Sequence, residues 1–232
     1  SRNTLVPTDS YTPVVVTERN SGQTVTVYNL APSLRGRFDF LFDNNPGLNS
    51  AFNGADFTVQ KRLSNRWMVL SGLSIGKNVG DIYGTADFNN PNFTFRRSVI
   101  EFDVPVSFKM SAAYQFPYDI SLSGNLQHFT GFPEEDQVTV GSNSVALTQV
   151  TQTIDIAPRG TNRLPSVNVG DLAVKRLFKF PRGVTAEPAL ELFNLTNANT
   201  VQGRVTTLGP AYQRATSIMR GRMLRVGVNV KF

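Results

Sequence analysis

The longest alternating segment of the chain constrains its fold more than any other feature. From Glu101 to Phe116, apolar residues occupy one parity and mostly polar residues the other. Apolar residues at every second position predict a β-strand with one apolar and one polar face. The segment is longer than the usual globular strand of about 5–6 residues. It is long enough for a tilted membrane-spanning strand, which needs about 9–11 residues.

Six further segments alternate in the same way, so the sequence predicts about seven long strands. These segments are Ala55–Leu63, Arg66–Lys77, Asp119–Phe129, Asp171–Phe180, Ala186–Leu195 and Ala215–Phe232. Near the amino terminus, Thr12–Thr17 and Gln23–Leu30 could form a hairpin over a short polar turn. Residues 35–53 are predicted to be a loop, with FDNNPGLN as its turn-forming run.

The predicted connections alternate strictly between short and long. The short ones are residues 64–66, 117–118 and 181–183, and the long ones are about 78–98, 130–167 and 196–214. A meander with its tight turns at one end and its long loops at the other is typical of outer-membrane β-barrels. The sequence therefore predicts an all-β, antiparallel, up-and-down meander that belongs to a transmembrane β-barrel.

Aromatic residues gather near the short turns. The residues concerned are Trp67, Tyr114, Phe116, Tyr118, Phe178 and Phe180, and Phe232 is expected at the same level. This placement is typical of the aromatic belt of a membrane protein, where amphipathic rings lie between hydrocarbon and headgroups. The alternative is ordinary hairpin packing around a core. The sorting of the connections favours the belt.

Composition argues against several function classes. Lys and Arg are scattered despite a net charge of +6, so no nucleic-acid interface is predicted. The chain has no Cys, hence no disulfide or thiolate metal site. The single His128 would have to serve any Ser-His-acid triad, and a solvated strand-end role is favoured for it. The chain is not expected to be an enzyme. No apolar run reaches the about 18 residues of a transmembrane helix.

Two groups of carboxylates are candidates for cation binding or for acid–base chemistry. Glu134, Glu135 and Asp136 form a cluster in a long connection that could bind a cation through oxygen atoms. A solvated loop that faces the ligand is the favoured interpretation. Glu187 and Glu191 lie on the polar parity of their strand, without a neighbouring nucleophile. No metal or cofactor site is predicted.

Several segments carry a family resemblance. They are FNGADFTVQKRLSNRWMVLSGLSIGK (52–77), NNPNF (89–93), AAYQFPYDISLSGNLQHFTGFP (112–133), residues 147–180, ELFNLTNANTV (191–201) and the terminal strand. Together they resemble the carboxyl-terminal part of TonB-dependent outer-membrane receptors. The most similar subgroup has a carboxypeptidase-regulatory-like amino-terminal domain and is common in Acidobacteria and Bacteroidetes.

The resemblance implies a location in the outer membrane of a Gram-negative bacterium and uptake of a small ligand. It implies a barrel of about 22 strands around a plug domain, with energy supplied through TonB. The implied partners are outer-membrane lipid, the barrel-assembly machinery, and the remaining barrel and plug. The last strand resembles the signal that this machinery recognises, through Leu224, Val226, Val228, Val230 and Phe232.

The chain departs from the family pattern in its size. It has only seven predicted strands, and nothing in it resembles the plug or the energy-coupling box. We therefore expect the tail of a barrel, cut within an extracellular loop. On this interpretation residues 1–54 are a loop hairpin with its connection, and residues 55–232 are barrel strands.

Two alternatives remain open at this point. In the first, the opening hairpin supplies an eighth strand and the chain closes as a small barrel. In the second, the chain is a soluble β-sandwich that binds carbohydrate. The sandwich would bury Phe102, Val104, Val106 and Phe108 in a core between two sheets.

Overall fold

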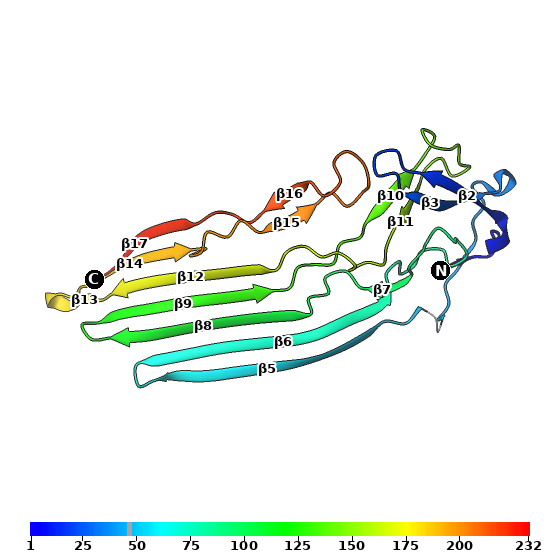
Figure 1. The fold of residues 1–232 in the computed structure, drawn as a ribbon. Helices are drawn as coiled ribbons and strands as arrows, with labels where there is room; N and C mark the ends of the chain where they lie inside the picture. The colour runs from blue at the N-terminus through cyan, green and yellow to red at the C-terminus, as the bar shows by residue number, and fades with distance from the viewer. Residues whose placement is uncertain (46–47) are drawn as a thin grey trace.

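The computed structural model describes residues 1–45 and 48–232. One antiparallel sheet dominates it, and each long strand of this sheet pairs with the next along the chain (Figure 1). The long strands are β5 (Ala51–Ser64), β6 (Trp67–Asp81), β8 (Val106–Phe116), β9 (Ile120–Phe129), β12 (Val167–Arg176), β14 (Thr185–Phe193) and β17 (Met223–Lys231). The short strands β7 (Arg97–Val99) and β13 (Phe178–Lys179) extend the sheet at β6 and β14. The predicted all-β, up-and-down meander is confirmed.

The short connections lie at one end of this sheet and the long ones at the other (Figure 1). Asn65 and Arg66 join β5 to β6 with positive φ angles of 51° and 71°. Tyr118 and Asp119 join β8 to β9 with φ angles of 66° and 55°. Successive positive φ angles give the backbone twist that matches tight antiparallel hairpins. A one-turn 3-10 helix, η4 (Pro181–Gly183), connects β13 to β14.

The long connections, together with the amino-terminal segment, form a second structural region, which we call the loop lobe (residues 1–45, 82–105, 130–166 and 194–222). Its short strands are β1 (Arg2–Asn3), β2 (Tyr11–Thr17), β3 (Thr24–Leu30), β4 (Phe40–Leu41), β10 (Gln137–Val140), β11 (Gln152–Asp155), β15 (Val201–Arg204) and β16 (Ala215–Ile218). They pair two by two, as β1–β4, β2–β3, β10–β11 and β15–β16. Two 3-10 turns, η1 (Thr8–Ser10) and η2 (Pro32–Leu34), complete the lobe.

The predicted opening hairpin is present as β2 and β3, which pair with each other over their full lengths. In the described part of the chain this hairpin forms a sheet of its own and adds no eighth strand to the long sheet. Likewise, no described pairing joins β5 to β17, the two outermost long strands. Closure into a small barrel is therefore not seen.

The hydrophobic core lies in the loop lobe. Its clustered members are Val16, Val27, Val138, Val140, Leu147 and Ile154. Among the described residues, the seven long strands contribute no buried hydrophobic side chain. The burial expected of a soluble sandwich is wrong, because Phe102 is 71% exposed and Val104, Val106 and Phe108 are only partly buried.

The strand predicted from residue 101 begins only at Val106. Residues 100–103 form a tight turn instead, in which Phe102 has a φ angle of 63°. The buried Asp103 fixes this turn. Its Oδ1 accepts a hydrogen bond from the Asn78 backbone amide at 2.7 Å, and its Oδ2 lies 2.6 Å from Arg163 Nη2.

The last predicted strand, 215–232, is two strands, because β16 pairs with β15 and β17 pairs with β14. Asparagine side chains hold the segment between them. Asn194 Nδ2 donates to the Arg220 carbonyl at 2.9 Å, and Asn197 Oδ1 accepts the Arg222 amide at 2.9 Å.

Other predicted boundaries shift by a few residues. The predicted division at 54/55 falls inside β5, which begins at Ala51. The predicted loop 35–53 contains β4 as well as the start of β5. Pro46 and Gly47 of the predicted turn run lie outside the described residues. The predicted strand 171–180 is β12 followed by the separate β13.

No helix in the described part of the chain has the length and apolar character needed to cross a membrane.

Candidate functional site

The register of the long sheet gives it one apolar face. Residues directly opposite each other on antiparallel strands point to the same face. One such row crosses six strands through Trp67, Tyr114, Leu122, Val174, Leu190 and Val226. The next row is Val69, Ala112, Gly124, Leu172, Leu192 and Leu224. The alternation predicted for separate strands is thus aligned across the whole sheet.

The other face of the sheet is largely polar. Ser111 Oγ donates to Asn125 Oδ1 on the neighbouring strand at 2.7 Å. Glu191 forms an ion pair with Arg225, and Lys175 Nζ lies 3.7 Å from a carboxylate oxygen of Glu187. Glu187 and Glu191 therefore lie on the polar face, as predicted, and both have basic neighbours.

The apolar face is open to its surroundings. Val226 is 72% exposed, and Val59 and Val228 are each 62% exposed. Soluble monomers rarely expose contiguous apolar patches larger than a few hundred Å². The apolar face of the long sheet runs across seven strands and is therefore unusually extensive for an exposed surface.

The residues predicted to form an aromatic belt are all exposed at the short-turn end. Trp67 lies opposite Tyr114, and the rings of Tyr114 and Phe116 are 4.6 Å apart. Tyr118 lies in the β8–β9 turn, while Phe178 and Phe180 lie just before η4. Lys61 Nζ is 3.9 Å from the centre of the Trp67 ring. The short-turn end of the sheet therefore combines aromatic rings with a cation, a combination that is typical of the boundary between hydrocarbon and water.

The predicted assembly-signal residues lie along β17 and just beyond it. Leu224, Val226, Val228 and Val230 all point to the apolar face and are more than half exposed. Phe232 is fully exposed beyond the end of the strand. Recognition of these side chains by assembly machinery stays a prediction.

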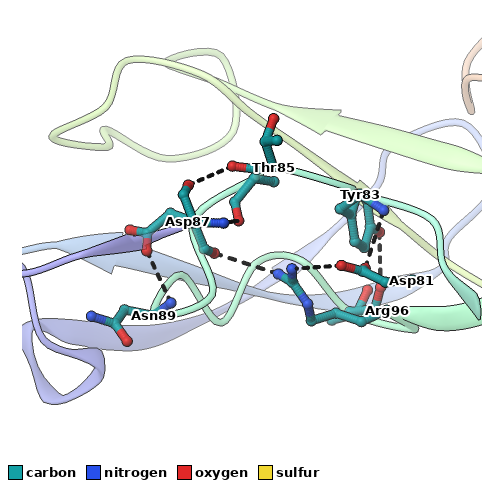
Figure 2. Close-up of polar contacts among 9 residues, drawn as sticks. Asp81, Tyr83, Thr85, Asp87, Asn89 and Arg96 are labelled. Carbon is teal, nitrogen blue, oxygen red and sulfur yellow. Dashed lines mark hydrogen bonds and ion pairs between the residues drawn. The ribbon is translucent and has the colours of Figure 1, made fainter. Parts of the chain in front are cut away.

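A polar network that the sequence analysis missed joins Asp81, the last residue of β6, to residues 83–96 of the loop lobe. Figure 2 shows Arg96 between Asp81, whose carboxylate is 3.2 Å away, and the Asp87 carbonyl at 3.4 Å. The same guanidinium lies 5.1 Å from the centre of the Phe88 ring. Tyr83 interacts with the Asp155 carboxylate of β11. Burial raises the pKa of Tyr83, and this hydrogen bond raises it further. The Arg96 contacts lie within one long connection, whereas the contact between Tyr83 and Asp155 joins this connection to the next one. None of these contacts follows a regular spacing in the sequence.

Two of the three acidic residues predicted to be solvated are buried. Glu134 is 6% exposed and Asp136 is 4% exposed, whereas Glu135 is partly exposed and pairs with Arg159. The cause is a contact between two long connections, since the Gln137 amide donates to the Thr206 carbonyl at 3.0 Å. Burial raises the pKa of Glu134, Arg204 opposes this shift, and Asp136 adds to it.

His128 lies near the end of a strand, as predicted. It is on β9, and its Nδ1 lies 2.8 Å from Asn168 Oδ1 on β12. The described residues contain no group of three or more His, Asp or Glu side chains arranged to hold a metal ion.

Comparison with known proteins adds no family. No protein-family model matches this chain, and no curated protein is significantly similar to it. The resemblance to TonB-dependent receptors therefore rests on the quoted segments alone.

Proposed function

We propose that this chain forms part of the wall of an outer-membrane β-barrel, as the carboxyl-terminal part of a TonB-dependent receptor that takes up a small ligand. One observation carries the proposal: the long sheet has a continuous exposed apolar face opposite a polar face. In a barrel wall the first face contacts lipid and the second lines the lumen.

The two ends of the sheet indicate which way the proposed barrel wall would cross the membrane. Outer-membrane barrels have short periplasmic turns and longer extracellular loops. The loop lobe would then lie outside the cell, and the level of Trp67 and Tyr114 would lie at the periplasmic interface. Ligand contacts are expected from the lobe and the polar face. The rest of the barrel and the plug would be the partners of this chain.

The single tryptophan provides a direct test. The chain would be folded into phospholipid vesicles that carry bromine at shallow or deep acyl positions. Trp67 fluorescence should be quenched more by the shallow bromines, because the residue lies at the aromatic level. Two variants in a Trp67→Phe background probe the faces: Met110→Trp on the apolar face and the adjacent Ser111→Trp on the polar face.

Met110→Trp should be quenched by the deep bromines, and Ser111→Trp only weakly by either lipid. Equal quenching of the two variants would contradict the assignment of the faces. A chain that stays folded and monomeric in buffer without lipid or detergent would contradict the membrane location itself.

A further inference from the structure

Two carboxyl groups in the loop lobe are buried without sufficient hydrogen-bond partners. Both oxygens of Glu134 and the Oδ1 atom of Asp136 are buried and make no hydrogen bond. Asp136 Oδ2 accepts a hydrogen bond from Asn162 Nδ2 at 2.6 Å. Buried charges are normally paired or bound to metal, because the loss of hydration is costly. Buried polar atoms without a partner therefore call for a ligand, such as an ion or water.

The nearest cation does not balance this charge. Arg204 Nη1 lies 3.6 Å from Glu134 Oε2, which is beyond ordinary hydrogen-bond distance. The same nitrogen donates to Gln213 Oε1 at 3.1 Å. Arg204 therefore divides its contacts between Gln213 and Glu134, and it makes no hydrogen bond to the Glu134 carboxylate.

The local backbone directs both carboxylates to one place. Burial alternates over residues 134–136, just before β10, since Glu134 and Asp136 are buried and Glu135 is partly exposed. Glu134 and Asp136 also lie close enough that each carboxylate acts electrostatically on Tyr212. Glu135 points to the other side, where it pairs with Arg159. Tyr212, from the third long connection, reaches Asp136 with its hydroxyl. Oxygen atoms from two connections therefore converge on this point.

We propose that Glu134 and Asp136 bind a Ca²⁺ ion at the contact between the second and third long connections of the loop lobe. The available donors are all oxygen atoms, and Ca²⁺ combines carboxylates with amide, carbonyl, hydroxyl or water oxygens in flexible geometry. A third acidic ligand is not required. The ion would compensate the negative charge that Arg204 does not neutralise. It would also link the connection of residues 130–166 to the connection of residues 194–222.

Terbium luminescence tests the site, because Tb³⁺ replaces Ca²⁺ and is sensitised by a nearby tyrosine such as Tyr212. The folded, chelator-treated chain should show tyrosine-sensitised Tb³⁺ emission that Ca²⁺ abolishes by competition. Glu134→Gln and Asp136→Asn should each weaken Ca²⁺ binding by at least about tenfold, the lower limit for losing even an outer-shell partner. Glu135→Gln is the matched control and should bind Ca²⁺ as the parent chain does.

Thermal unfolding provides the second measurement. Ca²⁺ should raise the unfolding temperature of the parent chain and of Glu135→Gln, but not that of Glu134→Gln. Without Ca²⁺, Glu134→Gln should be more stable than the parent chain, because it removes a buried charge. The proposal is overturned if Ca²⁺ changes neither emission nor stability in the parent chain, or if Glu135→Gln loses binding as the other variants do. Both measurements are made on the chain folded in detergent, and they report on the loop lobe and not on the surroundings of the long sheet, so their failure would leave the barrel proposal intact.

Discussion

Replacement of Leu172 by arginine places a charge on the apolar face near the middle of β12. Leu172 lies about 20 Å along the strand from Phe178, at about 3.3 Å per residue. If the sheet forms a barrel wall as proposed, a strand tilt of about 40° would place Leu172 at a depth of about 15 Å, close to the middle of an apolar band about 25 Å tall. An arginine on the lipid face at the midplane costs about 2–4 kcal/mol, so Leu172→Arg should lose that much stability.

The matched control is Ala173→Arg, one residue further on. Ala173 lies opposite Glu191 on the polar face, so its replacement should change the free energy of unfolding by less than about 1 kcal/mol. Denaturant titration of the chain in phospholipid vesicles, followed by Trp67 fluorescence, measures both values. Equal costs for the two variants would refute the assignment of the faces, as would a Leu172→Arg variant as stable as the parent.

Four further predictions concern the connections, the opening hairpin and a strand glycine. Gly131→Ala should cost about 1–3 kcal/mol, because its Cβ would lie 1.7 Å from a backbone oxygen, as denaturant titration would show. Gly227→Ala, where a Cβ meets nothing within 4 Å, should stay within about 0.5 kcal/mol of the parent. Asn194→Ala should cost about 2–3 kcal/mol and speed hydrogen exchange in residues 198–222, because its side chain holds three backbone groups there. The Asn20 backbone amide, with other turn groups, lowers the pKa of Glu18 to about 2. The stabilisation of the hairpin by Glu18 is therefore present above pH 4.5 and lost as the pH falls toward 2, so amide chemical shifts in the turn should titrate near pH 2 and not near 4.5.

The strand meander could be predicted because its signal is local. Apolar and polar residues alternate from Val106 to Phe116, within one strand. The short turns at Asn65 and Tyr118 clearly separate such alternating segments from one another. A period of two fixes which side chains share a face within a strand. The alignment of all strands then follows once each pairs with its neighbour.

The features that could not be predicted depend on contacts between distant segments. The alternation extends back to Phe102, but Asp103 contacts Asn78 and Arg163 and holds a turn there, so the strand begins only at Val106. The run Glu134–Asp136 is strongly polar, and its burial depends on the third long connection folding onto β10. No periodicity within either segment carries this information.

The position of the hydrophobic core also limits where the chain can change during evolution. Long surface connections usually tolerate insertions and substitutions, because little depends on their packing. Here the valines of β2, β3 and β10 form the only compact interior in the described part of the chain. We therefore expect the opposite of the usual pattern. Substitutions in the core of the connections should preserve side-chain volume, whereas the valines and leucines on the apolar face of the long strands can be replaced by any similarly apolar side chain.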